Sequence, residues 1–150
     1  MSEDLYRNIY NKALDIISRR EHSSKEVRDK LARKFNSDDL IESAIENLIT
    51  NNLINDIRFA EMYVLSRKKK GFGPKRIAYE LSSKGVKDSL SNEAIINEGG
   101  WLESAQNVFA KKFKEGPSSD FKESMKQKTF MQNRGFSFKE IDSVMQQDML

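Results

Sequence analysis

Apolar residues recur every three or four positions along this 150-residue chain, in short segments separated by turn and capping residues. This spacing gives each segment one apolar stripe when it is coiled as a helix. No segment shows the strict apolar-polar alternation of a strand. The pattern therefore predicts an all-α protein.

Helix starts are marked by short combinations of capping residues. They are the capping boxes Ser23-Glu26 and Ser137-Glu140, their aspartate equivalents Asp39-Glu42 and Asp120-Glu123, and the pair Gly73-Pro74. Together with the apolar segments, these marks divide the chain into about nine short helices.

A shift of 50 residues superimposes much of the first third of the chain on the second. Val27 and Leu31 fall on Ile77 and Leu81, and the last third follows more loosely, with Arg134-Gly135-Phe136 falling on Lys84-Gly85-Val86. Self-similarity at a fixed period indicates a repeat architecture. We predict three tandem three-helix repeats, at residues 4–54, 55–99 and 100–150.

A three-helix unit of this length buries little surface alone, so neighbouring units must complete one another's cores. We therefore expect an elongated, curved array. Its hinge points should lie at residues 51–56 and 97–100, where Asn and Gly interrupt the helical pattern. The second helix of each repeat should present one apolar pair to its core: Val27/Leu31, Ile77/Leu81 and Met125/Met131. Arg58, Phe59 and Trp101 are placed to pack between repeats.

Composition narrows the classes of function. Cysteine is absent, which excludes disulfides and thiolate metal sites. No apolar run approaches the ~20 residues that cross a bilayer, and the polar start does not resemble a signal peptide. We expect a cytoplasmic protein that does not enter membranes.

The sequence offers few candidate residues for catalysis or metal binding. His22, the only histidine, lies beside a capping box, where we expect a surface residue at a helix end. Glu42 and Glu46 share a helix face and could hold Mg²⁺, but acidic residues near a helix start are explained by the helix dipole alone. We predict no catalytic residue, no metal and no cofactor.

The middle of the chain concentrates positive charge. Six cations and no acid lie between Ser66 and Arg76, around the turn Gly71-Phe72-Gly73-Pro74. This turn is not a nucleotide loop, because Pro74 removes a backbone donor, no strand precedes it, and no hydroxyl residue follows Lys75-Arg76. Phe72 is interpreted as a staple onto the following helix, with base stacking as the alternative. Lys75 and Arg76, at a helix start, oppose the helix dipole and so point to a partner outside the protein.

Major-groove reading of DNA is disfavoured by charge, since the third helix of each repeat is acidic. Basic residues instead follow the first and second helices, which suits an extended polyanion or a filament. The candidate binding residues are Arg67, Lys68, Lys69, Lys70, Lys75 and Arg76, followed by Arg19, Arg20 and Arg134.

These segments resemble the RecX family, regulators of the bacterial recombinase RecA. The resemblance is carried by NDIRFAEMYVLSRKKKGFGPKRIAYELSSKGV at residues 55–86, by ALDIISRREHSSKEVRDKL at 13–31 and by FMQNRGFSFKEI at 130–141. It covers nearly the whole chain and departs from the family pattern at Asn55 and Ile57.

The resemblance implies three tandem three-helix repeats, which agrees with the periodicity. It also implies a non-enzymatic protein that binds the RecA–DNA filament and restrains recombination, ATP hydrolysis and coprotease activity. Single- or double-stranded DNA is a further expected partner, and we expect a monomer. The alternative is a DNA-binding helical module that ignores base sequence and acts without RecA.

Overall fold

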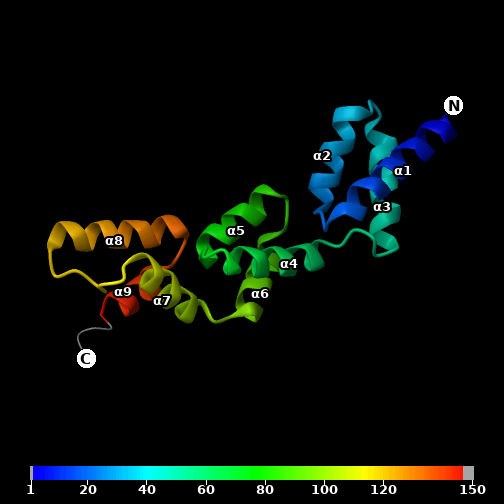
Figure 1. Ribbon diagram of the computed structural model, residues 1–150. Coiled ribbons are helices and arrows are strands. Elements are labelled where there is room, and N and C mark those ends of the chain that lie inside the picture. The colour runs from blue at the N-terminus through cyan, green and yellow to red at the C-terminus, as the bar shows by residue number, and fades with distance from the viewer. Residues whose placement is uncertain (1, 147–150) are drawn as a thin grey trace. The chain divides into compact units, whose positions relative to one another are not determined.

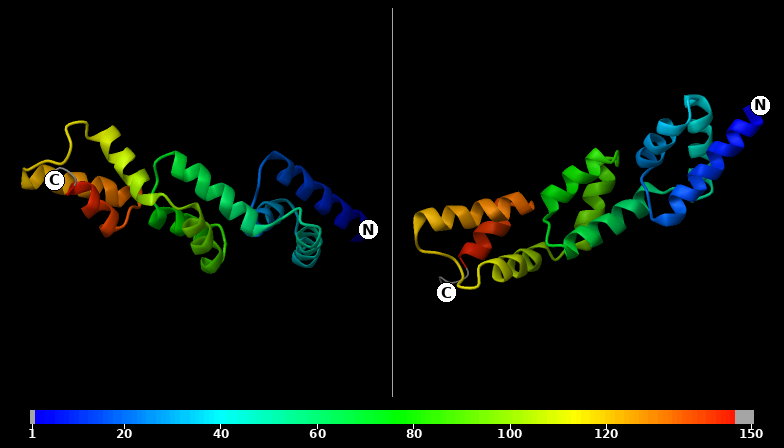
Figure 2. Two further views of the ribbon diagram at one scale, coloured as in Figure 1. Left: turned by 90° about the horizontal axis from the view of Figure 1, so that it is seen from below. Right: turned by 45° about the horizontal axis from the view of Figure 1, so that its top comes forward.

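The computed structural model describes residues 2–146, and within that range the chain forms nine helices and no strand (Figures 1 and 2). The first repeat contains α1 (Ser2–Arg19), α2 (Ser24–Lys34) and α3 (Asp38–Thr50). The second contains α4 (Asp56–Lys69), α5 (Pro74–Ser83) and α6 (Asp88–Glu98). The third contains α7 (Trp101–Lys112), α8 (Phe121–Arg134) and α9 (Phe138–Met145). The all-α class predicted from the hydrophobic pattern is confirmed.

Most of the helix starts read from the sequence are confirmed. Ser23 and Ser137 each form a complete capping box, and the Asp120 side chain accepts a hydrogen bond from the backbone N–H of Glu123 at 3.0 Å. Pro74 is the first residue of α5. The start predicted at Asp39 is wrong, because α3 begins at Asp38 and both aspartates lie in its first turn. There they face the positive end of the helix dipole, which gives them a role without capping.

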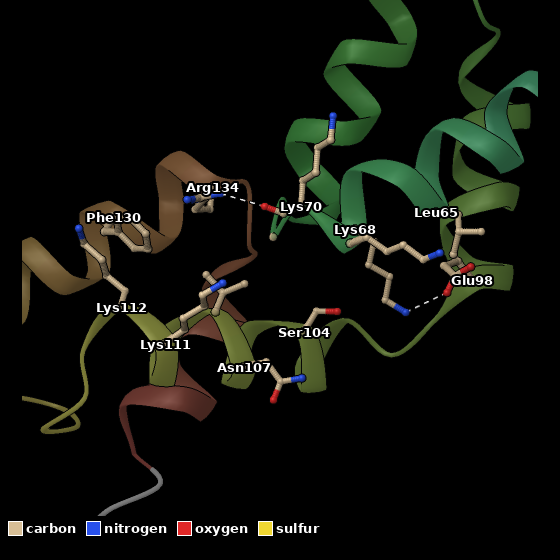
Figure 3. Close-up of a pocket in the computed structure, with 13 residues that line it drawn as sticks. Leu65, Lys68, Lys70, Glu98, Ser104, Asn107, Lys111, Lys112, Phe130 and Arg134 are labelled. Carbon is tan, nitrogen blue, oxygen red and sulfur yellow. Dashed lines mark hydrogen bonds and ion pairs between the residues drawn. The ribbon is translucent and has the colours of Figure 1, made fainter. Parts of the chain in front are cut away.

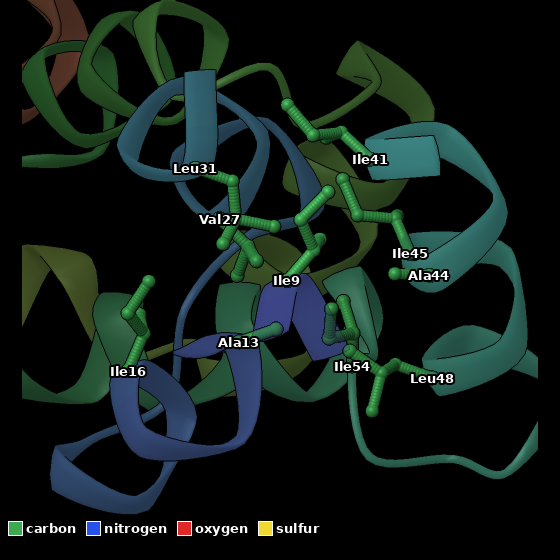
Figure 4. Close-up of a cluster of buried hydrophobic side chains, with 10 residues drawn as sticks. All are labelled: Ile9, Ala13, Ile16, Val27, Leu31, Ile41, Ala44, Ile45, Leu48 and Ile54. Atoms are coloured by element: carbon green, nitrogen blue, oxygen red, sulfur yellow. The ribbon is translucent and has the colours of Figure 1, made fainter. Parts of the chain in front are cut away.

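Each terminal repeat has a core of its own. In the first, buried side chains from three helices and the following turn meet in one cluster (Figure 4). Its members are Ile9, Ala13, Ile16, Val27, Leu31, Ile41, Ala44, Ile45, Leu48 and Ile54. The core of the third repeat consists of Ala105, Phe109, Met131, Phe136, Ile141 and Val144.

Of the apolar pair Met125/Met131, predicted to face the core from the second helix of the third repeat, one residue is predicted correctly and the other is wrong. Met131 is buried, but Met125 is 45% exposed, and the buried partner is Gln127 at 7%. Gln127 lies 50 residues after Ile77, whereas Met125 lies two residues earlier and faces the other side of the helix. The Gln127 amide accepts a hydrogen bond from the Ser118 N–H at 3.0 Å and donates one to the Gly116 carbonyl at 3.2 Å. It therefore fixes the loop before α8 from inside the core.

Two compact units make up the chain. One contains Met1–Met62 with Leu81–Ser91, and the other contains Tyr63–Glu80 with Asn92–Leu150. The division crosses α4, α5 and α6, so each unit holds one terminal repeat and part of the middle repeat. A turn of one repeat and the helix start of the preceding repeat consequently fall inside the same unit.

In the first unit, the turn after α5 docks on the start of α2. The Ser23 hydroxyl donates a hydrogen bond to the Lys84 carbonyl at 2.7 Å. Gly85 follows with φ +81°, and a Cβ on it would lie 2.6 Å from the Cβ of Lys25. Only glycine satisfies both the left-handed backbone and this close approach.

In the second unit, the turn after α8 docks in the same way on the start of α5. The Gly73 N–H donates to the Arg134 carbonyl at 2.7 Å, and the Lys75 N–H donates to the Gly135 carbonyl at 2.9 Å. Gly135 has φ +99°, and a Cβ on it would lie 2.6 Å from the backbone nitrogen of Arg76. The positions 23, 84 and 85 of the first joint are shifted by 50 residues to 73, 134 and 135. The joint between repeats is therefore itself repeated.

Replacing Gly135 with alanine should destabilise the protein by about 2–4 kcal/mol, because strain at positive φ adds to a clash with a backbone atom. Gly99→Ala is the matched control, since Gly99 also has positive φ, +61°, but a Cβ on it would make only an ordinary contact, 3.7 Å from the Ile96 carbonyl oxygen. It should cost only about 1–2 kcal/mol of backbone strain. Urea unfolding followed by circular dichroism measures both, and equal losses would contradict the steric role of the joint.

His22 contradicts the expectation of a surface residue, since only 3% of it is exposed. Its Nδ1 lies 2.9 Å from the Arg20 carbonyl and its Nε2 lies 2.8 Å from the Lys30 ammonium. A lysine ammonium can only donate, so Nε2 accepts, Nδ1 carries the proton and the ring is neutral. Burial lowers the pKa of His22, and the cations of Arg20 and Lys30 lower it further.

The protein should therefore lose stability as the pH falls from about 7 to 5. The unfolded chain takes up a proton near the ordinary histidine pKa of about 6.5, whereas the folded chain resists protonation, so acid favours unfolding. His22→Gln keeps a polar side chain that does not titrate, and its stability should fall less over this range. Urea midpoints at pH 7, 6 and 5 compare the two proteins, and parallel curves would rule out a contribution from His22.

Candidate functional site

The connection between α4 and α5 forms the centre of the basic region. Helix α4 ends with Arg67, Lys68 and Lys69, and the Phe72 N–H returns to the Arg67 carbonyl at 3.1 Å across Gly71, which has φ +90°. Helix α5 then begins at Pro74. The tight turn brings the cations at the end of α4 close to those at the start of α5.

Phe72 lies among three guanidinium groups. The central carbons of Arg67, Arg76 and Arg134 lie 3.9, 4.4 and 4.9 Å from the ring centroid. Cations are attracted to the face of an aromatic ring, so Phe72 helps to hold three like charges together. The Arg134 guanidinium also donates a hydrogen bond to the Lys70 carbonyl at 3.2 Å.

Glu80 supplies the counter-charge. It accepts two hydrogen bonds from Arg67, both at 2.9 Å, one from Arg76 at 3.2 Å and one from the Tyr63 hydroxyl at 2.9 Å. Burial by itself raises the pKa of Glu80, but the hydrogen bonds from Arg67, Tyr63 and Arg76 outweigh it and the pKa is lowered. Arg67 and Arg76 thus have partners within the protein, although Arg76 is exposed. The premise that Arg76 needs an external partner does not hold, because its guanidinium also reaches the Asn133 carbonyl at 3.1 Å.

Glu80→Gln should destabilise the protein by about 1–3 kcal/mol, because two arginines lose their carboxylate and one hydrogen-bond acceptor becomes a donor. Glu93→Gln is the control, since Glu93 is an exposed residue of α6. Thermal unfolding at pH 7 compares the two variants. A loss no greater than that of Glu93→Gln would show that the arginines do not depend on Glu80.

A groove of about 720 Å³ lies between the end of α4, the outer face of α7 and the end of α8 (Figure 3). It belongs entirely to the second unit. Leu65, Val108 and Phe130 supply apolar surface, and Ser104 and Asn107 supply hydrogen-bond donors. The cations that line it are Lys68, Lys69, Lys70, Lys111, Lys112 and Arg134.

The predicted binding residues are distributed over both units. Lys68, Lys69, Lys70 and Arg134 line the groove, while Arg67 and Arg76 surround Phe72 beside it. Lys75 lies on α5 with its ammonium 5.6 Å from the Phe138 ring centroid. In the first unit, Arg19 pairs with Asp15 at 3.4 Å and Arg20 with Glu26 at 3.1 Å.

The residues predicted to pack between repeats make specific contacts. Arg58 donates to the Glu21 carboxylate at 2.6 Å and to the Asn52 carbonyl at 3.2 Å. Phe59 is buried. The Trp101 indole donates to the Ile95 carbonyl at 2.9 Å, and the Lys68 ammonium lies 5.4 Å from its ring centroid.

Lys111 and Lys112 belong to the basic residues predicted to follow the first and second helices, but they were not among the candidate binding residues. Their place opposite Lys69 and Lys70 follows from how α7 packs within the second unit. Residues about 40 positions apart, without a shared motif, give no signal of this proximity in a single sequence.

The Mg²⁺ alternative at Glu42 meets a competing partner. Arg28 donates to the two oxygens of this carboxylate at 2.8 and 2.7 Å, and this hydrogen bonding lowers the pKa of Glu42. Across residues 2–146, His, Asp and Glu side chains do not gather in threes as a metal site requires. No helix in the same range is long and apolar enough to span a bilayer.

Tandem three-helix repeats with a cation-lined groove define a helical-repeat protein that carries a basic groove. Family models describing the first, second and third three-helix domains of RecX match residues 10–48, 55–95 and 102–145. The chain therefore belongs to the RecX family.

Individual relatives agree with this assignment. The regulatory protein RecX of Halorhodospira halophila is 37% identical over 130 residues, which cover 86% of this chain and 81% of the relative. The regulatory protein RecX of Vibrio vulnificus is 38% identical over 86% of this chain and 85% of its own length. The crystal structure of RecX from Lactobacillus salivarius superposes with a TM-score of 0.85 at 30% identity, covering 100% of both chains.

Proposed function

We propose that this protein is a non-enzymatic regulator that binds the RecA–DNA filament in the cytoplasm and restrains recombination, ATP hydrolysis and coprotease activity. The observation that carries the proposal is its membership of the RecX family over most of the chain. The proposed partner is RecA assembled on DNA, bound by one copy of this chain at a time.

The charge of the second unit supports a polyanionic partner. Within residues 2–146, four groove lysines have no carboxylate partner: Lys69, Lys70, Lys111 and Lys112. Cations at the end of a helix are favoured by its dipole, but that effect is worth only about 0.3–1 kcal/mol and does not require them to face a shared groove. A filament that combines acidic protein surface and phosphates offers these lysines the opposite charge.

Adding this protein to RecA on single-stranded DNA should slow RecA-dependent ATP hydrolysis in proportion to its concentration. A coupled ATPase assay measures the effect. Unchanged hydrolysis at every ratio to RecA would contradict the proposed function.

Lys69→Glu combined with Lys70→Glu should raise the protein concentration needed for half-maximal inhibition by about tenfold, because both lysines are exposed and make no ion pair within the described chain. The matched control is Lys122→Glu with Lys126→Glu, the same change of charge on α8 outside the groove. Arg76 is unsuitable for this test, because its guanidinium and backbone support the joint. Equal effects of the two double variants would exclude a local role for the groove.

A second candidate function is favoured by the groove itself: binding of DNA without regard to sequence and without RecA. A salt titration with bare DNA tests it. Micromolar or tighter affinity that falls steeply with salt supports this function, and the ATPase assay shows whether RecA is a target as well.

A further inference from the structure

The groove contains an excess of positive charge and one internal competitor for it. Among the described residues that line it, six are cations and only Glu98 is a carboxylate. Glu98, the last residue of α6, accepts a hydrogen bond from the Lys68 ammonium at 2.9 Å. An anion entering the groove therefore meets five cations that are not paired with a carboxylate, and one that is.

Lys68 does not depend on Glu98 for its position. Its ammonium also donates to the Gly99 carbonyl at 2.8 Å and lies over the Trp101 ring, 5.4 Å from the centroid. Three protein groups thus surround one ammonium, and only the carboxylate carries charge. Neutralising Glu98 should leave Lys68 in place and release its positive charge to the groove.

The dimensions of the groove favour a thin occupant. A volume of about 720 Å³ lies within the range of pockets that hold drug-sized molecules. A folded partner buries roughly 800 Å² per side, so it would cover the groove and its surroundings, whereas a single strand can lie within it. A single strand carries a charge at every nucleotide, so its successive phosphates can meet both the lysines that end α4 and those of α7 that line the groove. Ser104 and Asn107 can donate hydrogen bonds to phosphate oxygens.

We propose that this groove binds a short stretch of single-stranded nucleic acid through its phosphates, and that Glu98 limits the affinity by holding the charge of Lys68. The choice of a nucleic-acid strand rests on the proposed action at a RecA–DNA filament. The carboxylate acts as a built-in counter-ion: it repels incoming phosphate and reduces the number of cations available to it.

Glu98→Gln should tighten binding of a fluorescent oligothymidylate of about 20 nucleotides by about three- to tenfold, measured by anisotropy with the full chain and no RecA. Glu103→Gln is the control, because it removes the same charge from α7 at an exposed position outside the groove. Its affinity should stay within about twofold of the parent. If Glu98→Gln binds no more tightly than Glu103→Gln, the counter-ion role is overturned.

The salt dependence of binding gives a second readout. Each phosphate neutralised on a single strand contributes about 0.7 to the slope of log K against log salt. Glu98→Gln should steepen the slope by about 0.7, and Lys111→Ala with Lys112→Ala should make it shallower by about 1.4 and weaken binding about tenfold. Lys122→Ala with Lys126→Ala should leave the slope unchanged. Identical slopes for the two lysine pairs would place the strand outside the groove. Thermal unfolding checks that each variant is folded.

Competitors separate the possible occupants. Displacement by unlabelled oligothymidylate, and not by ATP at the same phosphate concentration, supports the strand. Equal displacement by ATP would identify a compact triphosphate site, and displacement by polyglutamate alone would identify an acidic protein surface. Either result overturns the proposal. If the protein inhibits RecA but binds no single strand, this inference is rejected and the proposed function is kept. If it binds the strand but does not inhibit RecA, the proposed function is rejected and strand binding by the groove is kept.

Discussion

Close approach of a side-chain-free turn to a helix start is the constraint on which the rest of the structure depends. Gly85 and Gly135 each lie against the start of the second helix of the preceding repeat, at a distance that leaves no room for a Cβ. In the second unit the bond from Gly73 to the Arg134 carbonyl fixes the end of α8 beside the end of α4. This packing places the Arg134 guanidinium over Phe72 and forms one end of the groove. The groove is thus a product of the joint between repeats, and neither repeat forms it alone.

The cations of the second unit fall into two groups with different physical roles. Arg67 and Arg76 contact Glu80 and the ring of Phe72, and these contacts stabilise the turn between α4 and α5. Lys69, the last residue of α4, and Lys70, which follows it, are exposed and make no ion pair with a carboxylate among the described residues. Arginine suits the first role because its planar group can pair with a carboxylate and stack on a ring at once, whereas lysine keeps a compact, strongly hydrated charge. A run of like charges in the sequence therefore contains both structural and available cations, and only the contacts distinguish them.

Local signals in the sequence were sufficient for the helices, the capping boxes and the repeated apolar positions, because hydrophobic period and capping chemistry act over a few residues. Two of the errors arose where hydrogen-bond partners outside the helix itself decide whether a polar side chain is buried. His22 is polar and lies in a turn, yet Lys30 and the Arg20 carbonyl satisfy both ring nitrogens and allow burial. Gln127 is buried in place of Met125 because its amide meets the backbone of residues 116 and 118. The groove could not be predicted either, since it needs α4 and α7 to face one another within one unit.

The turn after α2 in the first repeat lacks the glycine that the turns after α5 and α8 carry at Gly85 and Gly135. Phe35 stands 50 positions before Gly85, has an extended backbone with φ −120°, and packs its side chain against the first core. Asn36 is exposed, whereas Val86 and Phe136 at the equivalent positions are buried. The first repeat can receive a neighbour's turn but cannot offer one of its own. The joint is therefore directional: each copy uses the start of the second helix of one repeat and the turn after the second helix of the repeat that follows it.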